Sequence, residues 1–498
     1  MDWKKLQNGS DIRGVALAGV EGEDVNLTDV VTQKLAKAFA IWLKQKNGKS
    51  LQTLAVGSDS RLSSPDLRAA FAVGVVQTGN RIFDFGMAST PAMFMSTIDE
   101  RIGIDGAVMI TASHLPWNRN GLKFFTSEGG LNKEDIKSLL EIAASINDDD
   151  PMQQTSVQKN IEHLNFMDTY CQSLVDYIRL RANIGEQPLK GMHIIVDAGN
   201  GAGGFFADKV LIPLGAETAG SQYLEPDGNF PNHIPNPEDK TAMRSICDAV
   251  IRSKADLGII FDTDVDRSAI VDSKGAPINR NALIALIAAV ILREHPQSTI
   301  VTDSVTSDGL KEFIEAHHGV HHRFRRGYKN VINEAIRLNA NQEESWLAIE
   351  TSGHAALREN YFLDDGAFLV AKLLVEAARL RVEGKELQSL ISSLKQPNES
   401  KEIRFSILAS DFKAYGEQVL DHIKNTAEQL KGWQIVSPNH EGIRVACMAE
   451  DEKGWFLLRQ SLHDPVLPLN IEADVEGGVA RIEQKVLTLL SNFNALKF

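Results

Sequence analysis

An apolar run rich in β-forming residues ends at an aspartate four times along the chain, at residues 54–59, 193–197, 257–262 and 299–303. Helical segments lie between these runs, for example at 283–293 and 368–379. Strands that alternate with helices indicate α/β units on mixed or parallel sheets, which carry their chemistry in the loops after the strands. We therefore expect a protein built of α/β units, with functional residues directly after buried strands.

The chain is too long for a single hydrophobic core. Its 498 residues predict three or four domains. A polar stretch at 148–154 contains a proline and predicts the first linker, and residues 397–401 predict the last one. Strand-like runs and two helices follow that last linker, so we expect the chain to end in a smaller α+β module.

Net charge and hydropathy exclude several classes of partner. The formal net charge of −14 argues against nucleic acid. A phosphorylated substrate stays compatible, because clustered Arg and Lys side chains act locally when screening extends over about 8 Å. The longest apolar run, at 282–292, is too short to span a bilayer. Three scattered cysteines and an N-terminus without a signal region predict a cytoplasmic protein, or a plastid protein if a transit peptide has been removed.

A polar loop after one apolar strand presents a hydroxyl beside proton-handling groups. Ser113 is followed by His114, and Lys123 lies further along. This combination suits a nucleophile at a strand end, although a helix-capping serine would also explain Ser113. The hydrolase elbow Gly-x-Ser-x-Gly is excluded, because Thr111 and Leu115 occupy its glycine positions.

A second strand runs into a loop in which three carboxylates alternate: Asp262, Asp264 and Asp266, here called the carboxylate triad. Carboxylates this close repel one another unless a cation neutralises them, and hard oxygen ligands favour Mg²⁺. The loop is not an EF-hand, because Arg267 and Ser273 stand where Gly and Glu are required. An acidic turn without a metal is the alternative interpretation.

The two loops together resemble the α-D-phosphohexomutase family, the phosphoglucomutase and phosphomannomutase enzymes. In that family Thr-Ala-Ser-His-Asn-Pro carries the phosphoserine and Asp-Gly-Asp-x-Asp-Arg holds Mg²⁺. In this chain Leu115 replaces the Asn and Thr263 replaces the Gly. Further matching pieces cover nearly the whole chain, at residues 9–14, 57–64, 90–91, 197–203, 350–354 and 459–465.

The resemblance implies a fold of three similar α/β domains with mixed sheets and a smaller C-terminal α+β domain, arranged around a central cleft. The implied domains are 1–156 with the phosphoserine loop, 157–278 with the metal loop, 279–397 with the sugar-binding loop and 398–498 with the phosphate-binding loop.

The resemblance also implies roles for individual residues. The implied catalytic residues are Ser113, His114, Lys123 and Arg13, and the implied metal ligands are the carboxylate triad and Ser113. The implied substrate-binding residues are Arg267, Arg325, Gly327, Lys329, Glu350, Ser352, His354, Arg459, Ser461 and His463.

The C-terminal loop at 459–465 departs most from the family. Leu462 and His463 stand where small polar residues belong, and a further Arg is absent at Pro468 and Asn470. In the family this loop is a clamp for the phosphate that is not transferred. Each charge-assisted hydrogen bond to that phosphate that is lost and not replaced should weaken phosphate binding by about 1–3 kcal/mol. A protonated His463 would restore part of the loss.

The function implied is that of a Mg²⁺-dependent phosphohexomutase, which interconverts hexose 1-phosphate and hexose 6-phosphate through phosphorylated Ser113 and a sugar 1,6-bisphosphate. A synthase that releases the hexose 1,6-bisphosphate is the alternative, motivated by the altered clamp. A non-catalytic phosphosugar sensor is a third hypothesis. The expected partner is a small phosphosugar substrate, and we expect binding to neither nucleic acid nor a membrane. The expected oligomeric state is a monomer or a weak homodimer.

Overall fold

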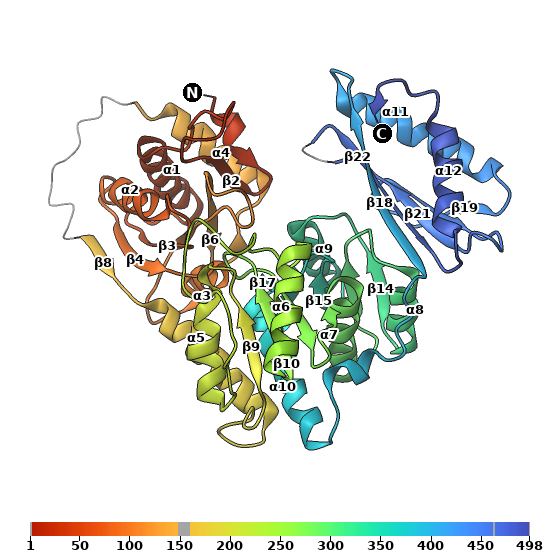
Figure 1. Cartoon of the computed structure of the whole chain (residues 1–498). Helices are drawn as coiled ribbons and strands as arrows, with labels where there is room; N and C mark the ends of the chain where they lie inside the picture. Colours follow the sequence, from red (N-terminus) through yellow and green to blue (C-terminus); the bar gives the residue numbers. More distant parts are fainter. Residues whose placement is uncertain (1, 148–159, 462–463, 498) are drawn as a thin grey trace. The chain divides into compact units, whose positions relative to one another are not determined.

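The computed structural model describes residues 2–147, 160–461 and 464–497. The chain divides into two compact units, which Figure 1 shows coloured along the sequence. Unit 1 comprises residues 1–283 and 352–389, and unit 2 comprises residues 284–351 and 390–498. The predicted first linker, 148–154, lies outside the described residues, as does the predicted boundary at 156.

The first sheet of unit 1 is mixed and has the strand order β1-β2-β6-β5-β3-β4-β8, with β7 paired to β6. Its strands are β1 (Gln7–Asn8), β2 (Asp11–Val15), β3 (Thr53–Ser58), β4 (Arg81–Met87), β5 (Gly106–Ile110), β6 (Arg119–Thr126), β7 (Gly129–Gly130) and β8 (Ile161–His163). β3 runs parallel to β4 and β5, whereas β6 runs antiparallel to β5 and β2.

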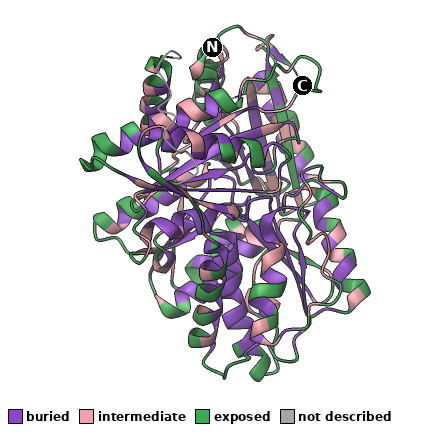
Figure 2. Ribbon diagram, turned by 90° about the vertical axis from the view of Figure 1, so that its left-hand side faces the viewer, coloured by how far each residue is buried: buried purple, intermediate pink, exposed green. Residues whose placement is uncertain are grey.

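Helices cover both faces of this sheet. They are α1 (Asp29–Asn47), α2 (Ser64–Val76), α3 (Thr90–Ile98) and α4 (Lys133–Ser145). Leu54 and Val56 of β3 belong to the apolar core shared with α1, α2 and α4. Side chains alternate across a strand, so Gly57 faces the other side, where a Cβ would lie 2.6 Å from the Met93 sulfur of α3. The strand β5 is accordingly buried along its whole length, and β3 is buried from Leu54 to Ser58. Figure 2 shows the buried residues of the chain in purple.

The second sheet of unit 1 has the order β12-β11-β10-β9, with β9 and β10 parallel and the other pairs antiparallel. Its strands are β9 (Ile194–Asp197), β10 (Leu257–Phe261), β11 (Ser268–Asp272) and β12 (Pro277–Ile278). Unit 1 also contains α5 (Phe166–Ala182), α6 (Lys240–Ser253), the antiparallel pair β16 (Ala355–Leu357) and β17 (Leu363–Asp364), and α10 (Gly366–Val382). Gly258 lets α6 approach β10, because a Cβ there would lie 2.6 Å from Val250.

Unit 2 combines a parallel and an antiparallel part. In the parallel part, β13 (Thr299–Thr302) pairs with β14 (Val320–Arg323) and β15 (Ser345–Ile349). The helices of this part are α8 (Asp308–Ala316) and α9 (Tyr328–Ala340), preceded by α7 (Arg280–Glu294), which begins in unit 1.

The antiparallel part of unit 2 is a six-stranded sheet of order β19-β20-β21-β22-β18-β23. Its elements are β18 (Glu399–Ile407), α11 (Phe412–Thr426), β19 (Trp433–Ile435), β20 (Ile443–Cys447), β21 (Gly454–Leu458), β22 (Val466–Ala473), α12 (Gly478–Leu490) and β23 (Leu496–Lys497). The α/β fold class with mixed sheets and a C-terminal α+β domain is thereby confirmed.

The predicted last linker at 397–401 is wrong for its second half. β18 already begins at Glu399 and pairs along its length with β22. The Glu399 carboxylate accepts hydrogen bonds from the main-chain N–H groups of Gly477 (2.7 Å) and Val479 (3.1 Å), at the start of α12. The polar residues that suggested a linker are therefore the solvent-facing start of a strand.

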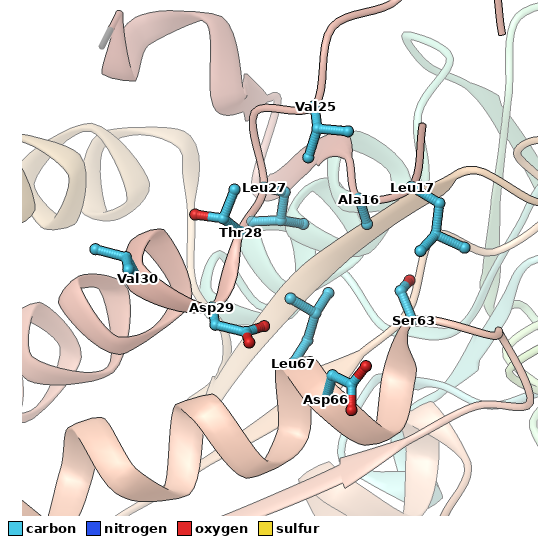
Figure 3. Close-up of a pocket in the computed structure, with 10 residues that line it drawn as sticks. All are labelled: Ala16, Leu17, Val25, Leu27, Thr28, Asp29, Val30, Ser63, Asp66 and Leu67. Atoms are coloured by element: carbon cyan, nitrogen blue, oxygen red, sulfur yellow. The ribbon is translucent and has the colours of Figure 1, made fainter. Parts of the chain in front are cut away.

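A cavity of about 380 Å³ opens at the N-termini of α1 and α2 in unit 1 (Figure 3). Leu27 and Leu67 form its buried wall, and the carboxylates of Asp29 and Asp66 lie beside it. The residues lining this cavity are distinct from all those to which the sequence analysis gives a catalytic, metal or substrate role.

Candidate active site

The loop after β5 places Ser113 in a constrained backbone conformation. Its φ is +50°, in the left-handed region that non-glycine residues rarely adopt. The main-chain N–H of Ser113 donates to Thr111 Oγ1 at 2.9 Å. The same residue's Oγ donates to Asp262 Oδ2 at 3.0 Å, across 149 residues of sequence. Ser113 is buried, and its hydroxyl points at the carboxylate triad.

Arg61 holds the main chain of this loop. Its buried guanidinium donates to the carbonyl oxygens of Ser113, Leu115 (2.6 Å) and Pro116 (2.8 Å), and Asp59 lies 3.4 Å from its Nε. The sequence analysis missed this role. The available signal was the pattern that marks the triad as well, an aspartate directly after a buried strand, here with an arginine two positions later.

The carboxylate triad follows β10 and is completely buried. One oxygen from each of its members lies within 4.8 Å of the others. Burial and the neighbouring Asp266 raise the pKa of Asp262 well above its ordinary value. Among the described residues, Oδ1 of Asp264 and Oδ1 of Asp266 have no hydrogen-bond partner. Hard anionic oxygens left unsatisfied in a buried site are the donor set that a divalent cation needs, so the residues fit Mg²⁺.

Lys123, on β6, supplies positive charge to the triad. Its Nζ donates to Asp264 Oδ2 at 3.0 Å and also to Asp266. Burial alone would lower the pKa of Lys123, but the two carboxylates raise it well above its ordinary value. Burial would likewise raise the pKa of Asp266, but Lys123 and neighbouring cations hold it below its ordinary value. The pair is therefore an ammonium and a carboxylate.

Arg13, on β2, reaches the Ser113 loop across Gly121 of β6. Its guanidinium donates to the carbonyl oxygen of Thr111 and, at 3.0 Å, to Asp11. A Cβ at position 121 would lie 2.7 Å from Arg13 Cδ and 2.2 Å from the carbonyl oxygen of Ile12. Glycine at position 121 is what lets this side chain cross the strand.

Arg267 touches the hydroxyl of Ser113. Its Nη2 lies 2.8 Å from Ser113 Oγ and 2.8 Å from His114 Nδ1, and its Nε donates to Asp262 Oδ2 at 3.0 Å. Asn236, another residue that the sequence analysis missed, accepts from Nη1 at 3.3 Å. Although His114 is exposed as a residue, desolvation of its ring and the guanidiniums of Arg267 and Arg13 lower its pKa to about 3.

His354 approaches the triad from the loop before β16. Its Nδ1 lies 2.5 Å from Asp364 Oδ2 and 4.0 Å from Asp266 Oδ1. Burial would lower the pKa of His354, but Asp364 and Asp266 raise it to about 9. In the same loop Ser352 is buried, and its Oγ has no hydrogen-bond partner among the described residues. Asp364 had no signal in the sequence, because only the fold brings it to His354.

The other predicted substrate-binding residues lie in unit 2. Glu350 Oε1 accepts from the N–H of Gly327 at 2.6 Å, so the two loops that carry them are joined. Arg325 donates from Nε to the carbonyl oxygen of His440 at 2.9 Å, and Lys329 lies in the first turn of α9.

Arg459 and Ser461 follow β21 in the same unit. Arg459 is buried, its Nε has no hydrogen-bond partner among the described residues, and burial lowers its pKa. Ser461 Oγ accepts from the N–H of Asp464 at 3.2 Å. His463 lies outside the described residues.

The structure therefore gathers Ser113, His114, Lys123, Arg13, Arg267, His354 and the triad in one group within unit 1. Glu350 and Gly327 are joined in unit 2. Within the described part of the chain, no helix is long and apolar enough to cross a membrane.

Relatives in sequence extend over almost the entire chain. A phosphoglucomutase of Neisseria gonorrhoeae is 28% identical over 483 residues, which cover 97% of this chain and 96% of the relative. A phosphomannomutase/phosphoglucomutase of Pseudomonas putida is 29% identical over 474 residues, covering 93% and 94%. A solved phosphoglucomutase/phosphomannomutase family protein of Burkholderia thailandensis has the same fold, with a TM-score of 0.77 at 24% identity and 98% of each chain covered.

Family models cover most of the sequence. The models of the phosphoglucomutase/phosphomannomutase α/β/α domains I, II and III match residues 4–150, 168–275 and 279–397. With the group around Ser113 in place, these matches show that the chain belongs to the phosphoglucomutase/phosphomannomutase family.

Proposed function

We propose that the protein is a Mg²⁺-dependent phosphohexomutase that interconverts hexose 1-phosphate and hexose 6-phosphate through phosphorylated Ser113 and a hexose 1,6-bisphosphate. The observation that carries the proposal is the position of Ser113 Oγ, 3.0 Å from a triad carboxylate and 2.8 Å from the Arg267 guanidinium. The names of the sequence relatives, phosphoglucomutase and phosphomannomutase, support it.

The carboxylate triad, with an oxygen of phosphorylated Ser113, would hold Mg²⁺. The bound cation supplies neutralisation of the negative charge that builds up on the phosphoryl group during transfer. The unsatisfied oxygens of Asp264 and Asp266 support this assignment.

In the forward half-reaction, a hydroxyl oxygen of the sugar phosphate attacks phosphorus. The bond from phosphorus to Ser113 Oγ breaks, a bond to the sugar oxygen forms, and the hydroxyl proton leaves to a base. Arg267 stabilises the serine oxygen as it takes up negative charge, because its Nη2 already donates there. The bisphosphate then reverses its orientation and returns its other phosphate to Ser113, which regenerates the phosphoenzyme.

The pKa directions narrow the roles of the proton-handling residues. Lys123 is held as an ammonium between Asp264 and Asp266, so we assign it to charge stabilisation rather than to proton abstraction. His114, with a pKa of about 3, is neutral near pH 7 and a weak base, so we assign it to hydrogen bonding beside Ser113 rather than to proton abstraction. His354, with a pKa of about 9, is a cation near pH 7 and suits contact with an anionic substrate.

We assign sugar contact to the loop of Arg325, Gly327 and Lys329 and to Glu350, which directly follows β15. We assign the same role to Ser352. We assign contact with the phosphate that is not transferred to Arg459, Ser461 and His463. The unsatisfied Nε of Arg459 and the unsatisfied Oγ of Ser352 support the assignment, since each is a buried donor that a ligand would satisfy.

The test is the Ser113→Ala variant with a panel of hexose 1-phosphates and hexose 6-phosphates, followed by phosphorus NMR. We expect loss of turnover by at least about three orders of magnitude, since the residue forms the covalent intermediate. Ser96→Ala is the matched control, because it removes a buried hydroxyl from helix α3. Retention of more than a small fraction of turnover by the Ser113 variant would show that another residue carries the phosphoryl group.

The same assay distinguishes the mutase from the alternative function, a synthase that releases the hexose 1,6-bisphosphate. Arg459 donates its main-chain N–H to the carbonyl oxygen of Pro468, a position that offers no side-chain donor to a phosphate. Phosphorylated enzyme incubated with glucose 1-phosphate should give glucose 6-phosphate. Accumulation of free bisphosphate without the isomer would favour the synthase.

A further inference from the structure

Thr263 joins the triad loop to the Ser113 loop. Its Oγ1 donates to the main-chain carbonyl oxygen of Ser113 at 2.8 Å, and the two residues are 150 positions apart in the sequence. The side chain is completely buried. The family motif quoted above has glycine at this position, and glycine has no side chain with which to form the bond.

The structure around Thr263 fixes its backbone. Its carbonyl oxygen accepts from the N–H of Ala202 at 2.8 Å. Gly201 packs directly against it, because a Cβ at position 201 would lie 2.8 Å from the Thr263 Cα. A hydroxyl mounted on a fixed backbone restricts the carbonyl group that it binds.

That carbonyl group belongs to the residue with the unfavourable φ of +50°. A left-handed non-glycine residue persists only where several contacts determine it together. At Ser113 these contacts are Thr111 on the main-chain nitrogen, and Arg61 and Thr263 on the carbonyl oxygen. A change in this backbone conformation would swing Oγ away from Asp262.

We infer that Thr263 is a positioning residue for phosphoryl transfer, whose hydroxyl holds Ser113 Oγ toward Asp262 and Arg267. The inference rests on the proposed mutase function for its effect on turnover. Its effect on the Ser113 loop itself is independent of that function.

The test compares Thr263→Val with Thr263→Ser and with Thr97→Val. Valine keeps the shape of threonine and removes the hydroxyl, whereas serine keeps the hydroxyl. Thr97 is the matched control, because its buried Oγ1 also donates to a main-chain carbonyl, that of Phe94 at 2.7 Å, within helix α3. The two valine variants therefore lose the same kind of hydrogen bond.

We expect Thr263→Val to lower kcat about ten-fold with KM within about two-fold of the parent, because a small misplacement of a nucleophile acts on the transition state. Thr263→Ser should recover most of kcat, and Thr97→Val should leave it unchanged. Hydrogen exchange of peptides covering residues 111–118 should accelerate in Thr263→Val alone.

Equal kcat values for the two valine variants would overturn the positioning role, even with faster exchange in the loop. Unchanged exchange at residues 111–118 would show that Thr263 does not hold the loop. If the parent carries no phosphate on Ser113 by intact-mass spectrometry, even after exposure to glucose 1,6-bisphosphate, the proposed mutase function fails instead, and the exchange comparison still decides whether Thr263 restrains Ser113.

Discussion

At the scale of single residues, the group around Ser113 balances charges that would be costly alone. Three buried carboxylates lie within 4.8 Å of one another, and the ammonium of Lys123 and the guanidinium of Arg267 reach into the same space. Buried charges persist where they are paired and hydrogen-bonded. The two unsatisfied carboxylate oxygens show where that pairing is incomplete, and it is there that we propose a divalent cation binds.

The carboxylate triad therefore predicts the behaviour of Asp264→Asn. We expect Mg²⁺ affinity, measured by isothermal titration calorimetry, to fall at least about ten-fold, because the substitution removes one anionic ligand. Asp272→Asn is the control. Asp272 is also a buried aspartate and is the last residue of β11, in the second sheet of unit 1. Its carboxylate instead accepts hydrogen bonds from the main-chain N–H groups of Lys274 and Ala276, in a turn. Equal affinities for Asp264→Asn and the parent would contradict the metal assignment.

The positions of candidate site residues could be predicted from the sequence where each residue directly follows its own strand. Ser113 and the triad belong to this class, because an apolar run followed by chemistry-bearing residues marks a strand end. Asp364 and Asn236 follow no such pattern, and the pattern of Asp59 and Arg61 does not show which groups Arg61 contacts. Asn236 contacts Arg267, 31 positions away, Arg61 contacts Ser113, 52 positions away, and Asp364 contacts His354, ten positions away. A single sequence does not encode which of these residues meet.

At the scale of elements, patterns of hydrophobicity located the strands, but polar composition led to a wrong prediction for the start of one strand, β18. The expected strand at 257–262 is β10 (Leu257–Phe261), with its aspartate directly after it. Residues 399–401 read as linker because they are polar and exposed. Their strand character comes from pairing with β22, which is a tertiary contact that overrides local preference.

Helix α1 illustrates a local signal that should be measurable. The side chain of Thr28 accepts from the N–H of Val31 at 3.3 Å and caps the helix, beside the cavity in Figure 3. We expect Thr28→Ala to lower the free energy of unfolding by about 1 kcal/mol in urea titrations, because it leaves a helical N–H without a partner. Thr28→Ser should retain most of the parent's stability. Similar losses for both variants would show that the methyl group, rather than the cap, stabilises this end.

At the scale of the whole molecule, the family models extend from residue 4 to residue 397, and the C-terminal part completes unit 2. That unit contains a buried carboxylate with an altered titration. Burial raises the pKa of the Glu472 carboxyl to about 7. The Trp455 indole, which donates a hydrogen bond to its Oε2 at 3.0 Å, acts in the opposite direction and lowers this pKa. Because the unfolded chain titrates near 4.5, the native state binds more protons between these values.

Stability should therefore fall as pH rises from about 4.5 to about 7, and this contribution should be constant above that range. Glu472→Gln removes the titration and keeps an acceptor for Trp455. We expect the difference in unfolding free energy between this variant and the parent to shift by about 1–3 kcal/mol in favour of glutamine across the range. Glu417→Gln, at an exposed position of α11, should show a constant difference. Parallel curves for the Glu472 variant and the parent would refute the assignment.

The bonds from Ser113 to Asp262 and Thr263 span 149 and 150 residues, and this has a consequence during synthesis. A ribosome adds about 5–20 residues per second. A growing chain thus exposes its serine for several seconds before the triad exists. Under the proposed function, the part of the chain that matches the first family model would have the nucleophile without its carboxylates, so a nascent chain should transfer no phosphoryl group until the part that matches the second model has been made and has folded.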